Sequence, residues 1–181
     1  MRVNREKAAE NRERIVEAAA RLFREHGFDG VGVDAIMKEA GLTHGGFYGH
    51  FASKEELATE AITRAFAQGS EKLGHCSDLG GLVNAYLSDA HCADRSEGCA
   101  LAALSADIAR EGKGVRHALT EDVVQRLARI AGFFKGAETS RRKRAIATLS
   151  GLVGALTLAR AVDDPTLRKE ILVAARGTFG A

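Results

Sequence analysis

The sequence predicts an all-α protein with about nine helices. Its 181 residues are 45% hydrophobic and 28% charged, which is the balance of a globular chain. Alanine and arginine are abundant, whereas the chain has one proline, no tryptophan and only 6% aromatic residues, a composition that disfavours strands. Apolar residues recur at helical spacing in successive segments, and no segment shows the alternation of a half-buried strand.

The first helix has the clearest pattern. Its apolar positions follow a 3.6-residue period: Ile15, Ala18, Ala19, Leu22 and Phe23. Gly27 is expected to end this helix in a left-handed conformation. A short second helix is predicted from about Asp34, as its N-cap, to Ala40, and Gly41 then makes a tight turn.

A third and a fourth helix follow this turn. Thr43 is placed to cap a short third helix from about His44 to His50. Ser53 and Glu56 have the spacing of a capping box, which opens the fourth helix. Residues 69–81 then contain four glycines and form the best break in the chain.

Five more helices are predicted beyond that break. Apolar stripes mark them near residues 82–87, 100–108, 119–134, 146–156 and 164–175. Gly98 and Gly112 bound the second of the five. Asp164 and Pro165 open the last one, as an N-cap followed by proline in the first helical position.

The second and third helices, joined by the Gly41 turn, predict a helix-turn-helix whose second helix enters the major groove of DNA. The net charge of +2 gives no hint of DNA, but residues 40–54 contain no acid. The candidate DNA contacts are Thr43, His44, Gly45, Gly46, Phe47, Tyr48, His50 and Lys54. The glycines permit close approach, and the hydroxyl, imidazole and ammonium groups are donors for phosphate oxygens. Phe47 and Phe51 are also expected to pack against the first helix.

Residues 12–57 resemble the DNA-binding domain of the TetR family of bacterial transcriptional regulators. The densest match is Ala40-Gly41-Leu42-Thr43, Gly45, Tyr48, His50-Phe51, Ser53-Lys54-Glu55 and Leu57. One departure is Gly32, where the family usually has Thr or Ser to contact a phosphate. The resemblance implies a DNA-binding domain at residues 1–54 and a ligand-binding and dimerisation domain at residues 55–181. It also implies a homodimer on a palindromic operator, most simply a repressor released by a small-molecule effector.

The resemblance further implies a ligand pocket and a dimer interface in the second domain. The candidate pocket residues are Phe66, Tyr86, Leu104, Ile108, Leu127, Ile130, Phe133, Phe134 and Leu152, although such a stripe also fits plain core. The candidate interface residues are Gly151, Gly154, Ala155 and Leu156 on the eighth helix and Leu167 and Ile171 on the ninth. The alternative for the glycines is close packing inside one subunit.

Three cysteines supply a second hypothesis. The segment from Tyr86 through Gly98-Cys99 to Leu104 resembles a sub-group of the family whose sixth helix starts with Gly-Cys, which implies that Cys99 lies at a helix N-terminus. That position stabilises a thiolate, so a regulator that senses oxidants or electrophiles through Cys99 is an alternative. Cys76 lies in the glycine-rich break and is expected to be exposed, and Cys92 follows His91. These residues do not have zinc-site spacing, so neither a metal nor another cofactor is expected. An enzyme or metal protein built on the His and Cys residues is the alternative from another class, and no nucleophile–base pair favours it.

Two further classes are disfavoured by the sequence. No run of about 18 apolar residues exists, so no membrane span is expected. Residues 1–17 carry both charges and lack the apolar segment of a signal peptide, so a cytoplasmic protein is expected.

Overall fold

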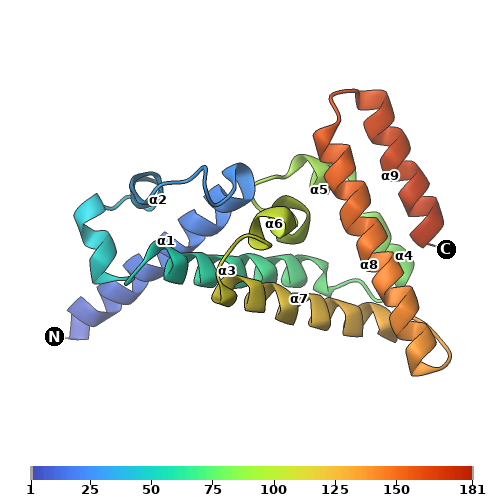
Figure 1. Ribbon diagram of the computed structural model, residues 1–181, viewed down its shortest axis with the longest axis horizontal. Helices are drawn as coiled ribbons and strands as arrows, with labels where there is room; N and C mark the ends of the chain where they lie inside the picture. Colours follow the sequence, from blue (N-terminus) through green and yellow to red (C-terminus); the bar gives the residue numbers. More distant parts are fainter. Residues whose placement is uncertain (1, 181) are drawn as a thin grey trace.

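The computed structural model describes residues 2–180, which form helices and connecting segments without a strand (Figure 1). The first part holds α1 (Arg2–His26), α2 (Val33–Glu39), a 3₁₀ helix η1 (His44–Gly49) and α3 (Lys54–Gly74). The second part holds α4 (Leu79–Tyr86), α5 (Asp89–Ala93), α6 (Ala100–Ile108), α7 (Lys113–Gly132), α8 (Glu138–Ala161) and α9 (Pro165–Phe179). None of these helices is long and apolar enough to cross a bilayer.

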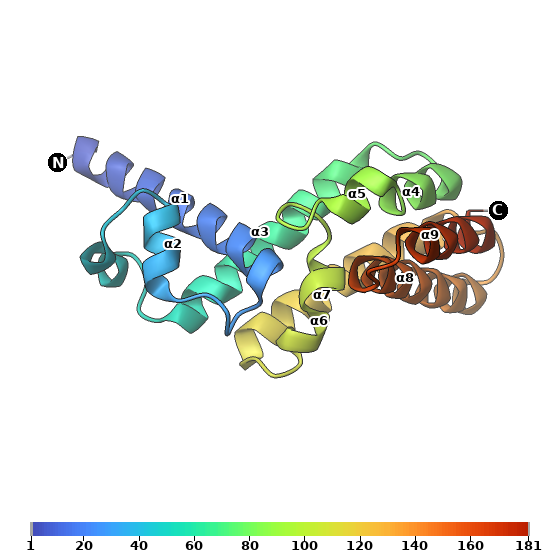
Figure 2. The same ribbon diagram turned by 90° about the horizontal axis from the view of Figure 1, so that it is seen from above.

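The N-terminal head consists of α1, α2 and η1, which lie at one end of the elongated molecule (Figures 1 and 2). Phe23, Ile36, Phe47 and Phe51 fill its core and are almost fully buried. These aromatic and branched side chains hold two short helices that could not persist alone, since short isolated helices are marginal in water.

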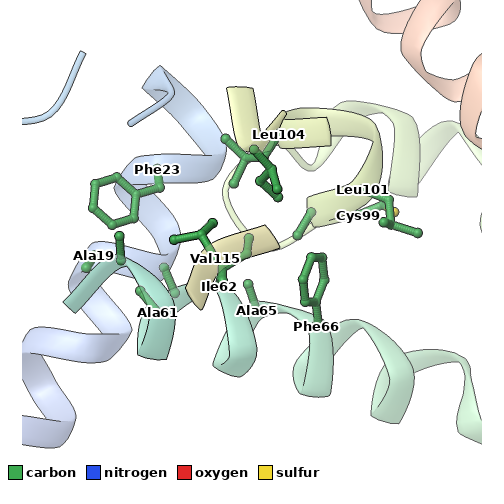
Figure 3. Packing of buried hydrophobic residues seen from close by; sticks show 14 of the residues in the cluster. Ala19, Phe23, Ala61, Ile62, Ala65, Phe66, Cys99, Leu101, Leu104 and Val115 are labelled. Carbon is green, nitrogen blue, oxygen red and sulfur yellow. The ribbon is translucent and has the colours of Figure 1, made fainter. Parts of the chain in front are cut away.

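The antiparallel pair α8 and α9 lies at the opposite end of the molecule (Figures 1 and 2). Between the two ends, α3 packs against α1 on one side and against α7 on the other. Figure 3 shows the junction, where Ala19 of α1, Ile62 of α3, Leu104 of α6 and Val115 of α7 gather. A single hydrophobic cluster therefore continues from the head into the second half.

The loop between α5 and α6 is held by cations from three helices. Arg24 of α1 donates to the Ser96 carbonyl, and Lys72 of α3 donates to the Glu97 carbonyl at 2.9 Å. Arg160 of α8 donates to backbone carbonyls at the end of α5, at 2.7 and 2.8 Å. The loop is thus tied to the head, to α3 and to the α8–α9 pair at once.

Several predicted local signals are present as expected. Gly27 and Gly41 have φ of 75° and 68°, the left-handed region that glycine adopts freely. The Glu56 N–H donates to Ser53 Oγ at 3.1 Å, and Asp164 caps α9 by accepting from the Thr166 N–H at 2.8 Å. The reciprocal bond of the capping box reaches Ala52 rather than Ser53.

Other local predictions are wrong. The second helix begins at Val33 with Gly32 as its N-cap, so Asp34 lies in the first turn and caps nothing. The third helix is 3₁₀, and Thr43 at its N-cap makes no side-chain cap. The fourth predicted helix, α3, continues through Gly69 to Gly74, which shortens the expected break to residues 75–78. The five-residue α5 has no counterpart in the prediction, because so short a helix shows no full period.

Candidate DNA interface and ligand cavity

Residues 43–50, which we call the reading segment, are presented by the Gly41 turn. The Leu42 N–H donates to the Met37 carbonyl at 2.8 Å, and the Gly46 N–H donates to the Thr43 carbonyl at 3.0 Å. A Cβ atom at Gly45 or at Gly49 would meet no atom within 4 Å. Packing inside the chain therefore does not require glycine at either position.

The reading segment turns most of its predicted contact residues outward. Tyr48 is 71% exposed, and Thr43, His44 and Gly45 are exposed as well. Gly46 and His50 are half-buried. These positions give the segment a hydroxyl, a phenol and two imidazoles near its surface.

Phe47 is the exception, because its side chain is fully buried. Its ring stacks on Phe51 at 5.8 Å between centroids and meets the edge of Tyr48 at 5.2 Å. The Arg12 guanidinium lies 4.5 Å from the Phe51 ring centroid on the same cluster. The Phe47 side chain, predicted both as a DNA contact and as a packing residue, therefore lies in the core of the head and supports Tyr48.

Lys54, predicted as a DNA contact, makes contacts inside the head. Its ammonium donates to the Phe28 carbonyl at 2.6 Å and lies 5.9 Å from the Phe23 ring centroid. The side chain thus ties the start of α3 to the connector after α1. At least one of its three donors is used inside the head rather than on DNA.

Two features of this surface were not found from the sequence. The Asp34 carboxylate pairs with Nδ1 of His44, which places an acid beside the reading segment. The exposed basic side chains Arg5, Lys7 and Lys38 lie on α1 and α2 of the same head. The sequence of a mixed-charge helix does not indicate which face its basic residues occupy. These three side chains could therefore not be selected from the sequence as candidates for the DNA surface.

A cavity of about 300 Å³ lies between α3, α4, α7 and α8, and we call it the central cavity. Of the predicted pocket residues it contains Tyr86, Ile130 and Leu152. The full lining is Ser70, Leu73, Gly74, Leu82, Tyr86, Gln125, Arg126, Arg129, Ile130, Leu149 and Leu152.

The remaining predicted pocket residues lie elsewhere. Phe66 lines a second cavity of about 410 Å³ between α3 and α7, and Ile108 lines a separate depression between α6 and α7. Leu104 and Leu127 are buried in the core. Phe134 is buried under the Arg144 guanidinium, 3.9 Å from its ring centroid, and Phe133 packs at the edge of the core. Apolar spacing marks buried faces and does not separate core from cavity.

The charged residues of the central cavity were missed. Arg126 Nε donates to the buried carboxylate of Asp122 at 2.6 Å. Burial opposes the charge on Arg126, but the hydrogen bond and charge of Asp122 outweigh it and raise the pKa of Arg126. For Asp122, burial raises the pKa of the carboxyl group, and the hydrogen bond and charge of Arg126 offset part of that rise. The one available sequence signal was the Asp–Arg spacing of four, which places both side chains on one face of a helix.

Cys99 takes the predicted N-cap position of α6, but the thiol is only 4% exposed. The Tyr86 hydroxyl donates to Cys99 Sγ at 3.0 Å, and burial raises the pKa of Tyr86 well above its ordinary value. His91 shares a hydrogen bond of 2.5 Å with the Tyr86 carbonyl. Cys92 is buried, whereas Cys76 is half-buried rather than exposed.

In residues 2–180 no three His, Cys, Asp or Glu side chains gather as metal ligands would.

The predicted interface residues of α8 and α9 divide into two groups. A Cβ atom at Gly151 would overlap the Phe179 ring, so this glycine serves packing inside the subunit, and Leu156 is fully buried. Gly154 has no neighbouring atom within 4 Å of a Cβ position. The second group, which we call the outward group, comprises the half-buried Gly154, Ala155 and Ile171 and the exposed Leu167, and the exposed Leu158 lies one turn beyond Gly154.

Comparisons with known proteins agree with this architecture. The sequence model described as "Bacterial regulatory proteins, tetR family" matches residues 15–61. The HTH-type transcriptional regulator LmrA of Bacillus subtilis is 31% identical over 121 residues, or 62% of this chain and 64% of that protein. An HTH-type transcriptional regulator of Staphylococcus aureus is 42% identical over 60 residues, 33% of this chain and 32% of its own. The chain thus matches less than two thirds of the length of either relative.

Two solved structures share nearly the whole fold. A TetR-family regulator from Cytophaga hutchinsonii superposes with a TM-score of 0.78 at 19% identity, covering 96% of this chain and 94% of its own. A TetR regulator from Chloroflexus aurantiacus gives 0.76 at 21% identity, covering 95% of each chain. The two solved structures show the fold, and the sequence matches of the head and of LmrA identify the chain as a member of the TetR family of transcriptional regulators.

Proposed function

We propose that this regulator is a repressor that binds a palindromic operator as a homodimer through two copies of the reading segment. A small-molecule effector in the central cavity releases it. The observation that carries the DNA role is the 71% exposed Tyr48 on its buried Phe47–Phe51 support. The exposed phenol hydroxyl is a hydrogen-bond donor of the kind that binds phosphate oxygens of DNA.

Glycines in the reading segment support the same role. Each costs a helix up to about 1 kcal/mol relative to alanine, and no atom in the described part of the chain fills the space beside Gly45 or Gly49. A phosphate backbone approaching that space accounts for them. Thr43, His44, Gly45, Gly46, Tyr48 and His50 are the proposed contacts, with Lys54 placed behind them in a supporting role.

The dimer and the effector site rest on the second half of the chain. The outward group on α8 and α9 offers an apolar face on two antiparallel helices, as a four-helix interface requires. The central cavity lies among α3, α4, α7 and α8, and α3 continues directly into the head. An effector that favours one placement of α3 shifts the spacing of two heads in the dimer. In this role the protein works in the cytoplasm, on DNA, and not as an enzyme.

A gel-shift experiment with the DNA upstream of the gene for this chain tests the proposal. Retarded bands at low salt are expected, with the affinity of Tyr48→Ala and Tyr48→Phe lowered about tenfold or more on every bound sequence, because a phosphate bond carries no sequence information. His44→Ala is expected to change the preference between sequences. Val124→Ala, at an exposed position of α7, is the matched control. No binding to any palindrome, or full affinity in Tyr48→Ala, would refute the proposed role.

A further inference from the structure

We infer that the central cavity takes a small organic monoanion, a carboxylate on an apolar body, held by Arg126 and Arg129. The inference rests on the proposed function, in which this cavity is the effector site. It adds the chemical class of the effector, which neither the fold nor the relatives supply.

The first argument is the charge of the lining. Two guanidinium groups, those of Arg126 and Arg129, face the central cavity, and no acid lines it. Asp122, the partner of Arg126, lines the second cavity instead, so the ion pair stands between the two cavities. The three groups together carry a charge of about +1 at neutral pH. One carboxylate balances that charge, whereas a cation or a dianion would leave a buried excess, which is costly in a partly apolar site.

The second argument is the supply of donors. Arg126 gives Nε to Asp122 at 2.6 Å, and its Nη2 reaches the Phe66 carbonyl only at 3.5 Å. Its Nη1 makes no hydrogen bond to any residue that the structure describes, although the side chain is only 12% exposed. Arg129 is anchored through Nη2 alone, to the carbonyls of Leu73 and Cys76 at 2.5 and 3.3 Å. Both side chains are thus held in place while keeping N–H groups for a bidentate acceptor, the geometry that carboxylates provide.

The third argument concerns size and the rest of the lining. Leu73, Leu82, Tyr86, Ile130, Leu149 and Leu152 make most of the wall apolar. About 300 Å³ equals the liquid volume of roughly ten water molecules. A ligand of about that many non-hydrogen atoms, with one charged end against α7, fits both the wall and the volume.

Cinnamate, cinnamamide and cinnamylamine are probes with the same apolar body. Their end groups are anionic, neutral and cationic, respectively. Calorimetry and thermal shift with the full chain are expected to show cinnamate binding at least tenfold more tightly than either analogue. Arg126→Gln alone would leave Asp122 buried without a counter-ion, so the double variant Asp122→Asn/Arg126→Gln, which keeps a neutral pair, is used instead. That variant keeps the net charge but removes the Arg126 donors, so it is expected to reduce the tenfold preference. Arg129→Gln removes the net positive charge and is expected to abolish the preference, while Arg142→Gln on the exposed start of α8 keeps it.

Equal binding of cinnamate and cinnamamide, or an undiminished preference in both cavity variants, would overturn the inference. These results are separable from failure of the proposed function, because operator binding is measured on the same samples without any probe. If the chain binds its operator and is released only by neutral compounds, the proposed function stands and the inference about the anion is wrong. If the chain binds cinnamate with the expected preference but binds no operator, the anion preference of the cavity stands and the proposed function is wrong.

Discussion

Gly151→Ala and Gly154→Ala form a matched pair, one turn apart on α8, with opposite expected effects. A methyl group at position 154 projects into space that the subunit leaves empty, whereas one at position 151 overlaps the Phe179 ring of α9. Gly154→Ala should therefore stabilise the isolated subunit. Gly151→Ala should be less stable than Gly154→Ala, because the half-buried ring must turn away or α9 must shift.

The magnitude follows from two contributions. Alanine is about 0.8–1.0 kcal/mol more favourable than glycine inside a helix, and this gain is common to both variants. Overpacking at position 151 adds a cost of about 1–3 kcal/mol. The common gain cancels in the comparison, so the two variants should differ by about 1–3 kcal/mol, or about 2–12 °C in Tm for a chain of this size.

Thermal unfolding is recorded at the lowest usable chain concentration, since dimerisation adds stability by mass action. Sedimentation equilibrium of both variants then measures the dimer. If α8 and α9 form the proposed interface, Gly154→Ala weakens association and Gly151→Ala leaves it nearly unchanged. Equal Tm values for the two variants would refute the Phe179 contact. An unchanged dissociation constant in Gly154→Ala would remove this face of α8 from the interface.

Three further outcomes are expected. Lys54→Ala should lower the Tm through loss of its charged hydrogen bond to the Phe28 carbonyl, worth about 1.5 kcal/mol at a partly exposed site; weaker DNA binding at unchanged Tm would instead make this lysine a phosphate contact. Burial lowers the pKa of His91, so the unfolded chain binds a proton more readily and stability is lost as pH falls below about 6.5. Urea midpoints at pH 7.5 and 5.5 should differ less in His91→Gln than in the parent, and equal differences would contradict that assignment. Ellman's reagent should titrate one thiol quickly, Cys76, and the two buried thiols only in urea. A second fast thiol that is present in the native chain and absent from Cys99→Ser would favour Cys99 as an oxidant sensor.

The fold could be predicted from the sequence where one signal dominates. The apolar stripe from Ile15 to Phe23 has a single helical period, and Asp164 before Pro165 fits only the start of a helix. The helices predicted from these two signals are both confirmed. The break at residues 69–81 was overestimated because a glycine cost of about 1 kcal/mol is small beside the packing of α3 on α7. Propensity is a local quantity, and tertiary contacts decided the length of α3.

The candidate sites divide in the same way. Exposure of Tyr48 could be predicted because a known helix-turn-helix order fixes which residues face outward. The pairing of Asp34 with His44 joins two elements that approach only after the Gly41 turn is formed, so no spacing along the chain announces it. Arg126 and Arg129 of the central cavity are a similar case. From the sequence, a guanidinium on a helix is expected to be solvated, and only the packing of the neighbouring helices shows that it lines a cavity.

The continuity of α3 has an evolutionary consequence. This helix supplies Leu57, Ala58 and Ala61 to the core of the head and Ser70 and Leu73 to the wall of the central cavity. A recombination event that exchanged the second half of the chain at residue 55 would cover the head with a foreign helix that had not been selected to pack against α1. New effectors are therefore acquired more safely by point changes on α7, such as those at Gln125 and Arg129, which touch the cavity and leave the α1–α3 contact intact. Drift in ligand preference, rather than swapping of halves, is the route this architecture leaves open.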